Sequence, residues 1–230
     1  MMEEKEKIEG FIEKSVKELK KLWEESEEEA IKKKGRNEFF SFFSSLAFPE
    51  ISSSLLEKVS NKFLKEFDWK KFEEREYLGA DLGFFLSAFL KKSIENCILP
   101  QEKKGINKEG NIKPIDVRLN IKKLPVRLDY LGYQNPKKLH LIVEGNCGIR
   151  TGNEMRGGKI IVKGNCKMWT GEDMQNGELI VKGEVKSFHK SAFSPNNQGI
   201  IILKGTEIWR NGYWTKEGKE IWEKGEILVG

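Results

Sequence analysis

The chain has no long apolar run and few cysteines, and each shortage excludes a class of protein. Its longest apolar stretch, residues 82–90, is far shorter than the roughly 20 residues that span a bilayer. The first residues are charged, which predicts that no signal peptide is present. Three cysteines without a CxxC pair indicate neither a disulfide framework nor a zinc finger. We therefore expect a protein of the reducing cytoplasm without a membrane segment.

Residues suited to catalysis are also scarce. Two histidines leave little material for acid–base chemistry, and the sequence has neither a Ser-His-Asp order nor an HExxH motif. Its glycine-rich turns lack the GxxxxGK[ST] spacing of a phosphate loop. We expect no catalytic residue, no cofactor and no metal site. The sequence favours a chain without intrinsic activity.

Charge is plentiful and unevenly divided. Charged residues make up 33% of the 230 residues, and 34 lysines outnumber 7 arginines. Residues 1–97 carry a net charge of −3 and the remainder +8, which indicates two halves with different surfaces. Abundant Lys and Glu with only four Gln is typical of thermophile proteins. An AT-rich genome gives the same bias, and both explanations stay open.

Residues 1–100 have helical periodicity. Apolar residues recur at steps of three and four from Ile8 to Trp23, and a second helix is indicated through Leu55 to Phe67. A last helix, over residues 82–98, is apolar on most sides and should lie centrally in a bundle. The dense phenylalanines of residues 39–48 are interpreted as core, because aromatic residues at helical spacing usually pack together.

The amino-acid composition changes near residue 100. Residues 101–124 contain Gly, Lys and Asn in a linker-like mixture and are predicted as a linker or lead-in. Alternating apolar residues such as Val117, Leu119 and Ile121 then indicate strands. We expect a β-rich domain over residues 125–205 and a C-terminal cap over residues 206–230.

The β-rich domain is built from a repeat of nineteen residues. Residues 146–164 read NCGIRTGNEMRGGKIIVKG and residues 165–183 read NCKMWTGEDMQNGELIVKG, with ten identical positions. Partial copies, LHLIVEG at 139–145 and GIIILKG at 199–205, flank them. This period is too short for helical-hairpin repeats, which need about 33 residues. It suits one coil of a parallel β-helix, whose coils stack about 4.8 Å apart.

Such stacking predicts ladders of equivalent residues. We expect Ile142, Ile161 and Ile180 in one inward ladder and Met155 with Met174 in another. Glycines at each strand end and corner should allow turns with positive φ, which costs little only for glycine. The predicted structural glycines are Gly145, Gly152, Gly158, Gly164, Gly171, Gly177, Gly183 and Gly205.

The pattern N-x-G-x-x-x-G-x-x-M-x-G-G-x-I-x-V-x-G resembles a known repeat. It is similar to the GXGXG repeat that occurs in the C-terminal domain of the glutamate synthase large subunit and in one of the subunits of formylmethanofuran dehydrogenase. The resemblance covers residues 125–205, and the helical half takes no part in it. It implies a right-handed parallel β-helix that serves structure and assembly, with the chemistry done by other domains or subunits. The fold class that we expect is therefore α+β, with helices followed by a short β-helix.

Cys147 and Cys166 occupy one position of successive coils. Their stacking distance would permit a disulfide or a two-thiolate metal site. Val185 continues this ladder, so we favour small buried thiols that fill the core, and we assign no metal. His140 lies in line with Lys159 and Glu178 on the expected outer face. The carboxylates of residues 172 and 173 are expected in a solvated turn.

Aromatic and cationic residues offer a second set of candidates. Arg150, Trp169 and Phe188 should share a ladder, either as a stack that stabilises the coils or as a binding surface. In the tail, Asn211-Gly212 is a strong hairpin signal. Trp209 and Trp214 would cover the last coil or anchor an interface.

These observations favour a non-catalytic scaffold that binds a protein partner or forms a homo-oligomer. An accessory subunit of a glutamate synthase-like or formylmethanofuran dehydrogenase-like complex is the alternative that the resemblance implies. Polyanion binding through the basic half is a further alternative, with Lys163, Lys182 and Lys204 in one ladder and Glu144 at its start. Lysine is abundant throughout the chain, so we expect no nucleic-acid partner. No small-molecule ligand is identifiable.

Overall fold

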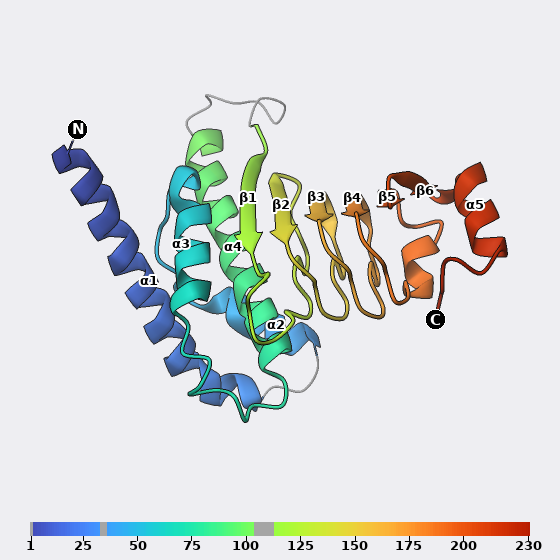
Figure 1. Cartoon of the computed structure of the whole chain (residues 1–230). Coiled ribbons are helices and arrows are strands. Elements are labelled where there is room, and N and C mark those ends of the chain that lie inside the picture. Colours follow the sequence, from blue (N-terminus) through green and yellow to red (C-terminus); the bar gives the residue numbers. More distant parts are fainter. Residues whose placement is uncertain (1, 33–35, 104–112) are drawn as a thin grey trace.

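The computed structural model describes residues 2–32, 36–103 and 113–230, and it places a helical unit beside a β-solenoid (Figure 1). The helices of the first unit are α1 (Met2–Ile31), α2 (Arg36–Ser45), α3 (Ser53–Glu66) and α4 (Leu78–Lys103). The solenoid follows with about four turns, so the α+β class with an N-terminal helical region is confirmed. Part of the predicted linker, residues 104–112, lies outside the described residues.

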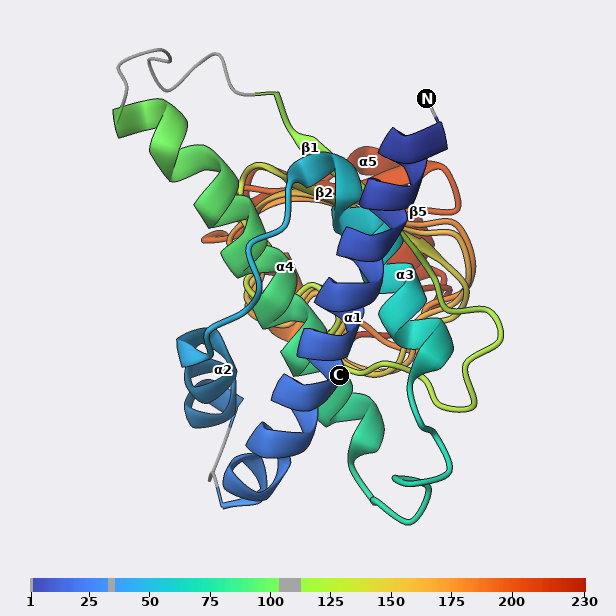
Figure 2. The same cartoon turned by 90° about the vertical axis from the view of Figure 1, so that its left-hand side faces the viewer.

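The apolar helix α4 is the centre of the helical unit. Its Leu82, Phe85 and Phe89 are fully buried, and α1, α2 and α3 surround it (Figure 2). Trp23 of α1 lies edge-on to Phe85, with ring centroids 5.3 Å apart, and stacks on Phe43 of α2. The aromatic residues therefore form core, as their helical spacing predicted. No described helix is long and apolar enough to cross a bilayer.

The solenoid consists of parallel strands that pair in chain order. Strand β1 (Ile115–Asn120) begins within the predicted lead-in, and β2 (Leu139–Glu144), β3 (Arg156–Val162), β4 (Asn176–Val181) and β5 (Ile200–Leu203) follow. The chain then turns back in β6 (Thr206–Arg210) and β7 (Tyr213–Trp214), which pair antiparallel. Helix α5 (Lys216–Glu223) closes the far end (Figure 1).

The inward ladders are shifted by one residue from the predicted ones. Leu141, Ile160, Leu179 and Ile201 are in register, and none of these four side chains is exposed to solvent. Ile142, Ile161 and Ile180 lie on the other face and are only partly buried, so the prediction that they point inward was wrong. The reason is strand alternation, because residue 142 shares a face with His140, two positions earlier. The Met155 and Met174 side chains are buried as expected.

The corner glycines serve two different purposes. Gly152 and Gly171 have φ near +70° (72° and 71°) and form one ladder of left-handed residues. Gly164 and Gly183 do not have positive φ, contrary to the prediction. A Cβ on Gly164 would lie 2.4 Å from the carbonyl oxygen of Gly145, so this position requires glycine because stacked coils approach closely there. The other repeat glycines with positive φ are Gly145, Gly158, Gly177 and Gly205.

Helix α4 seals the first coil through a row of small residues. Gly79, Gly83 and Ser87 are spaced by four residues and therefore lie on one face of the helix. A Cβ on Gly83 would lie 1.7 Å from the carbonyl oxygen of Asp129, so only glycine permits this contact. The Ser87 hydroxyl donates to the Tyr130 carbonyl at 3.2 Å and accepts from the Gly132 amide at 3.0 Å. The helical unit is thus packed on the open end of the solenoid (Figure 2).

Helix α3 covers the free edge of β1 with side chains. Asn61 accepts a hydrogen bond from the Asn120 amide at 2.7 Å and donates to the Arg118 carbonyl at 2.6 Å. Glu57 accepts from the Arg118 amide at 3.1 Å. These contacts satisfy an edge that would otherwise offer free backbone groups to another strand.

At the other end, two tight turns reverse the chain. The predicted Asn211-Gly212 hairpin is confirmed, with φ of 48° and 89°. Lys204 and Gly205 form a second such turn between β5 and β6, with φ of 51° and 87°. The β5 edge is therefore occupied by β6.

Candidate functional site

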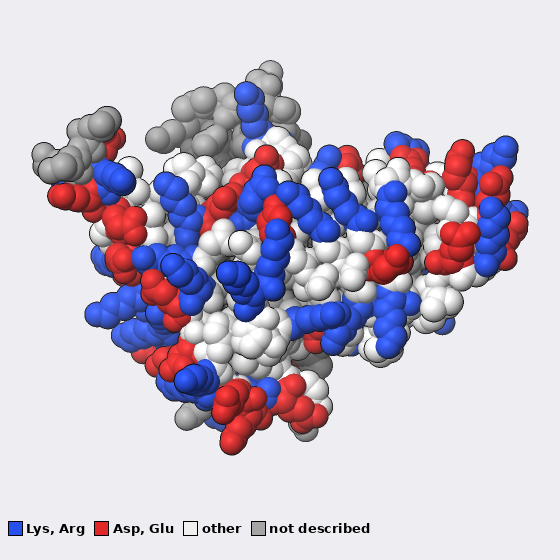
Figure 3. Space-filling model, in the orientation of Figure 1, with Lys and Arg blue, Asp and Glu red and all other residues white. Residues whose placement is uncertain are grey.

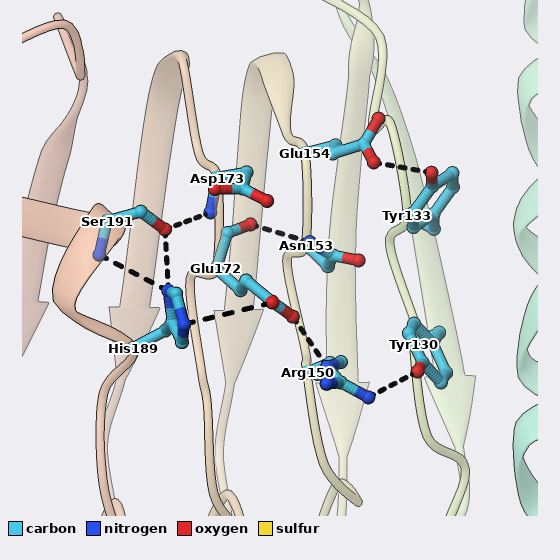
Figure 4. Close-up of polar contacts among 9 residues, drawn as sticks. All are labelled: Tyr130, Tyr133, Arg150, Asn153, Glu154, Glu172, Asp173, His189 and Ser191. Atoms are coloured by element: carbon cyan, nitrogen blue, oxygen red, sulfur yellow. Dashed lines mark hydrogen bonds and ion pairs between the residues drawn. The ribbon is translucent and has the colours of Figure 1, made fainter. Parts of the chain in front are cut away.

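A polar ladder crosses the coils on the side of the solenoid opposite the strands (Figure 4). Arg150 lies at its centre, and its Nε donates to Glu172 at 2.5 Å while its Nη1 donates to the Tyr130 hydroxyl at 2.6 Å. The guanidinium lies 4.4 Å from the centroid of Trp169. Tyr130, Arg150 and Trp169 all have φ between 54° and 59°, so equivalent left-handed positions of successive coils hold the three side chains in line.

This ladder continues into the helical unit. The ring of Phe84 on α4 stacks on Tyr130 with centroids 4.2 Å apart. Tyr133, three residues after Tyr130, donates its hydroxyl hydrogen to Glu154 of the next coil at 2.6 Å. The arrangement is therefore a stack that fastens the coils to each other and to α4, and it corresponds to the structural alternative predicted for Arg150 and Trp169.

Glu172 is the residue of this ladder that the sequence placed wrongly. It was expected in a solvated turn, yet it is only 5% exposed and pairs with Arg150. Its other oxygen lies 3.9 Å from Nε2 of His189. The repeat gives no signal for this pairing, because Glu172 lies three residues after Trp169, the residue of the next coil that is equivalent to Arg150.

His189 and Ser191 bring a serine, a histidine and a carboxylate together. The Ser191 hydroxyl lies 2.8 Å from Nδ1 of His189, and the same nitrogen accepts the Ser191 backbone amide at 3.3 Å. His189 is thereby the N-cap of the short 3₁₀ helix Lys190–Phe193. Ser191 also accepts from the Asp173 amide at 2.7 Å, which joins the last two coils. These contacts are those of a helix cap and a coil junction.

Of the predicted interaction surface, Phe188 lies elsewhere than expected, and Trp209 and Trp214 take the covering role that was one of their two predicted alternatives. Phe188 is in register with Thr170 rather than Trp169 and is 1% exposed. Trp209 is 2% exposed and donates its indole hydrogen to the Asn197 carbonyl at 3.1 Å. Phe188 and Trp209 therefore belong to the core. Trp214 is partly buried and stacks between Phe193 and Trp222, so it closes the end of the solenoid.

The two stacked cysteines are buried free thiols. Cys166 pairs with Val185 in register, as predicted, and Cys147 lies beside Cys166. Hydrogen bonding to Cys166 and burial raise the pKa of the Cys147 thiol well above its usual value. A neutral thiol is a poor metal ligand and nucleophile, so these residues fill space in the core.

The outer face of the sheet carries an apolar row between charged rows. Ile142, Ile161, Ile180 and Ile202 are in register across β2 to β5 and partly exposed. Beside this row lie His140, Lys159 and Glu178, as predicted, and Lys159 pairs with Glu178 at 2.7 Å. Figure 3 shows this face, with basic side chains gathered over the strands.

Comparison with known proteins gives no relative. No protein family matches the chain, and no curated protein or solved structure matches it significantly. Among the described residues, no three His, Cys, Asp or Glu side chains are grouped so that they could hold a metal ion. The surfaces described above are therefore the basis for a functional proposal.

Proposed function

We propose that the chain is a non-catalytic interaction scaffold whose outer sheet face binds a protein partner or a second copy. The observation that carries this proposal is the row of four isoleucines on a surface open to solvent. A contiguous apolar strip bordered by charged residues is typical of a protein–protein contact. The flanking Lys159 and Glu178 would give such a contact its orientation.

The closed ends of the solenoid support the choice of a face. Strand addition at β1 is blocked by Glu57 and Asn61 of α3, and the β5 edge is occupied by β6. A partner that added a strand would have to displace these contacts. The outer face needs no rearrangement, because its side chains are already ordered by the stacked coils.

Family and location are also proposals. The repeated glycines and methionines support membership of the GXGXG family, and an accessory role in a glutamate synthase-like or formylmethanofuran dehydrogenase-like complex follows from it as the alternative. A cytoplasmic location is supported by Cys147 and Cys166, which are adjacent and yet free. Neighbouring genes that encode such enzyme subunits would favour the alternative.

The experiment is a quantitative affinity capture from the native cell with three tagged forms of the full chain. One is wild type, one carries Ile161→Thr with Ile180→Thr, and the control carries Lys216→Gln with Lys224→Gln on the remote end. Threonine keeps the strand preference of isoleucine but removes apolar surface. Protein stoichiometry is measured by mass spectrometry and the mass of the complex by light scattering.

The proposal requires a partner, or a second copy, at fixed stoichiometry with the wild type and the control but not with the threonine form. Equal recovery with all three forms would remove the outer face as the contact. A monomeric chain without a stoichiometric partner, or turnover by the pure protein, would contradict the scaffold function itself.

A further inference from the structure

Three neighbouring hollows share lining residues, and they run from the junction between the helical unit and the solenoid along the solenoid itself. The first has a volume of about 800 Å³ and lies between α3 and β1, with Trp69 in its lining. The second, of about 430 Å³, shares Lys122 and Glu144 with the first. The third, of about 450 Å³, shares Arg127 with the second and extends to the corners of the later coils. We call this continuous depression the basic groove.

The lining of the basic groove is strongly cationic. Eight basic and three acidic side chains line it, so its net charge of +5 equals that of the whole chain. Figure 3 shows basic side chains gathered over the strands, whereas acidic side chains are frequent over α1 and near α5. The cations are Lys65, Arg118, Lys122, Lys123, Arg127, Lys163, Lys167 and Lys186.

Among the described residues, three of these eight cations take part in ion pairs. Arg118, Lys122 and Lys163 all pair with Glu144, whose pKa falls to about 2 mainly through the hydrogen bond from Lys163. The other five make no ion pair within the described part of the chain. Lys167 and Lys186 are 19 residues apart and so occupy one position of successive coils, which stack about 4.8 Å apart, and Arg127 lines the same hollow.

The groove also offers neutral donors and apolar surface. Asn165 uses its Oδ1 to accept the Glu184 amide at 2.8 Å, which leaves its NH₂ group available in the third hollow. Ile149 and Met168 line the same hollow. At the other end Trp69 is partly buried, with its ring packed on Phe67 at a centroid distance of 4.7 Å. It is one of the residues that line the first hollow.

We propose that the basic groove binds the sugar–phosphate backbone of single-stranded nucleic acid, with Trp69 as a stacking platform for a base. Unpaired cations in line with amide donors are the groups that contact phosphates, and an aromatic ring in a basic groove suits an unpaired base. A duplex fits poorly, because the site is concave and presents no helix or ribbon to enter a major groove. The sequence alone gave no reason to expect a nucleic-acid partner, because lysine is abundant throughout the chain. The fold brings eight of the basic residues together in one groove.

The test measures fluorescence anisotropy of a labelled 20-nucleotide oligo(dT) and of oligo(rU) with the full chain at 50 to 200 mM salt. Each neutralised phosphate contributes about 0.7 to the logarithmic salt slope of a single strand. Five unpaired cations therefore predict a slope of about 3.5 and a loss of affinity of about a hundredfold over this range. Lys167→Gln with Lys186→Gln should lower the slope by about 1.4.

Two further variants test the groove from opposite directions. Trp69→Leu should weaken binding about tenfold through lost stacking. Glu144→Gln removes the carboxylate that occupies Arg118, Lys122 and Lys163, so it should tighten binding. Lys216→Gln with Lys224→Gln is the matched control, because it removes the same charge from the α5 end, outside the groove. Thermal unfolding confirms that each variant is folded.

The proposal is overturned if the wild type fails to bind either oligonucleotide at tens of micromolar and 50 mM salt. It is also overturned if the α5 control weakens binding as much as the groove variant, or if duplex DNA binds equally well with the same salt slope. These outcomes are independent of the outer-face proposal, because the threonine variants leave the basic groove intact.

Discussion

Neighbouring residues of a solenoid strand have opposite surroundings. Ile160 of β3 is fully buried between Leu141 and Leu179, whereas Ile161 is partly exposed on the outer face. Two residues of the same type, side by side, therefore have different roles. The first stabilises the coil and the second is available for contact with another molecule.

This difference predicts unequal effects of the same substitution. Ile160→Ala should lower the free energy of unfolding by about 2–5 kcal/mol, because it leaves a cavity in the core. Ile161→Ala should cost less than about 1 kcal/mol, since less apolar area is removed from a dry environment. Chemical denaturation of the two variants measures both values. Equal losses would mean that the faces of β3 are assigned incorrectly.

The buried thiol of Cys147 gives a prediction for pH dependence. Its pKa in the folded chain is raised above the usual 9.0, by hydrogen bonding to Cys166 and by burial. The folded state therefore holds its proton more tightly than the unfolded state, so this contribution to stability is present below pH 9 and is lost as the pH rises above it. Wild type should lose stability above about pH 9 more steeply than Cys147→Ala. Parallel curves from about pH 8 to about pH 10.5 would contradict the shift.

The sequence predicted the glycine corners apart from the backbone conformation of Gly164 and Gly183, and it predicted the methionine and cysteine ladders, because a repeat marks equivalent residues directly. It missed the pairing of Arg150 with Glu172, and the junction of His189 with Ser191. These contacts join different positions of different coils, and the last coil is irregular in length. Alignment of the coils cannot find them, because it relates only residues at the same position of the repeat.

At the scale of elements, the packing of α4 against the first coil of the solenoid depends on the small residues of the helix. Gly83 faces the backbone of Asp129, whereas Gly10 in α1 has no neighbouring atom within 4 Å of a Cβ. Both glycines lie in helix interiors, so intrinsic helix preference affects them alike. Only their packing differs.

Alanine at these two positions should therefore change stability in opposite directions. Gly10→Ala should stabilise the chain by up to about 1 kcal/mol, the difference in helix preference. Gly83→Ala should destabilise it by about 3 kcal/mol or more, because helix and solenoid must separate. Thermal and urea unfolding measure both. A neutral Gly83→Ala would show that α4 is not seated on the first coil.

The cover of α3 on strand β1 gives a second prediction for an element. Asn61→Ala removes two hydrogen bonds to β1 and should cost about 1–3 kcal/mol. It also frees an edge, so the variant should self-associate more strongly as concentration rises. Lys58→Ala, elsewhere on α3, is the control. Light scattering that shows no difference between the two variants would contradict the role of the cover.

For the whole molecule, periodicity predicted both halves of the fold but not their junction. Helical spacing identified the helical half, and the nineteen-residue repeat identified the stacked strands. That α4 would seal the first coil through Gly79, Gly83 and Ser87 was not predicted, although their four-residue spacing marks a face on which a neighbour can approach closely. The inward isoleucine ladder was wrong by one residue, which is the smallest error that exchanges the faces of a strand.

The resulting molecule is a short solenoid with both ends closed. A helical unit closes one end, and a hairpin with α5 closes the other. What stays open are its long sides: the polar ladder, the basic groove and the outer face with its isoleucine row. Contact through the outer face is the central claim.

The most direct test replaces Ile161 with a photo-reactive phenylalanine analogue in the full chain and irradiates the native cell. We expect one crosslinked species of defined mass, either with a partner or with a second copy. The same analogue at Lys216, on α5, should give none. A stable complex that crosslinks from position 216 and not from position 161 would contradict contact through the outer face.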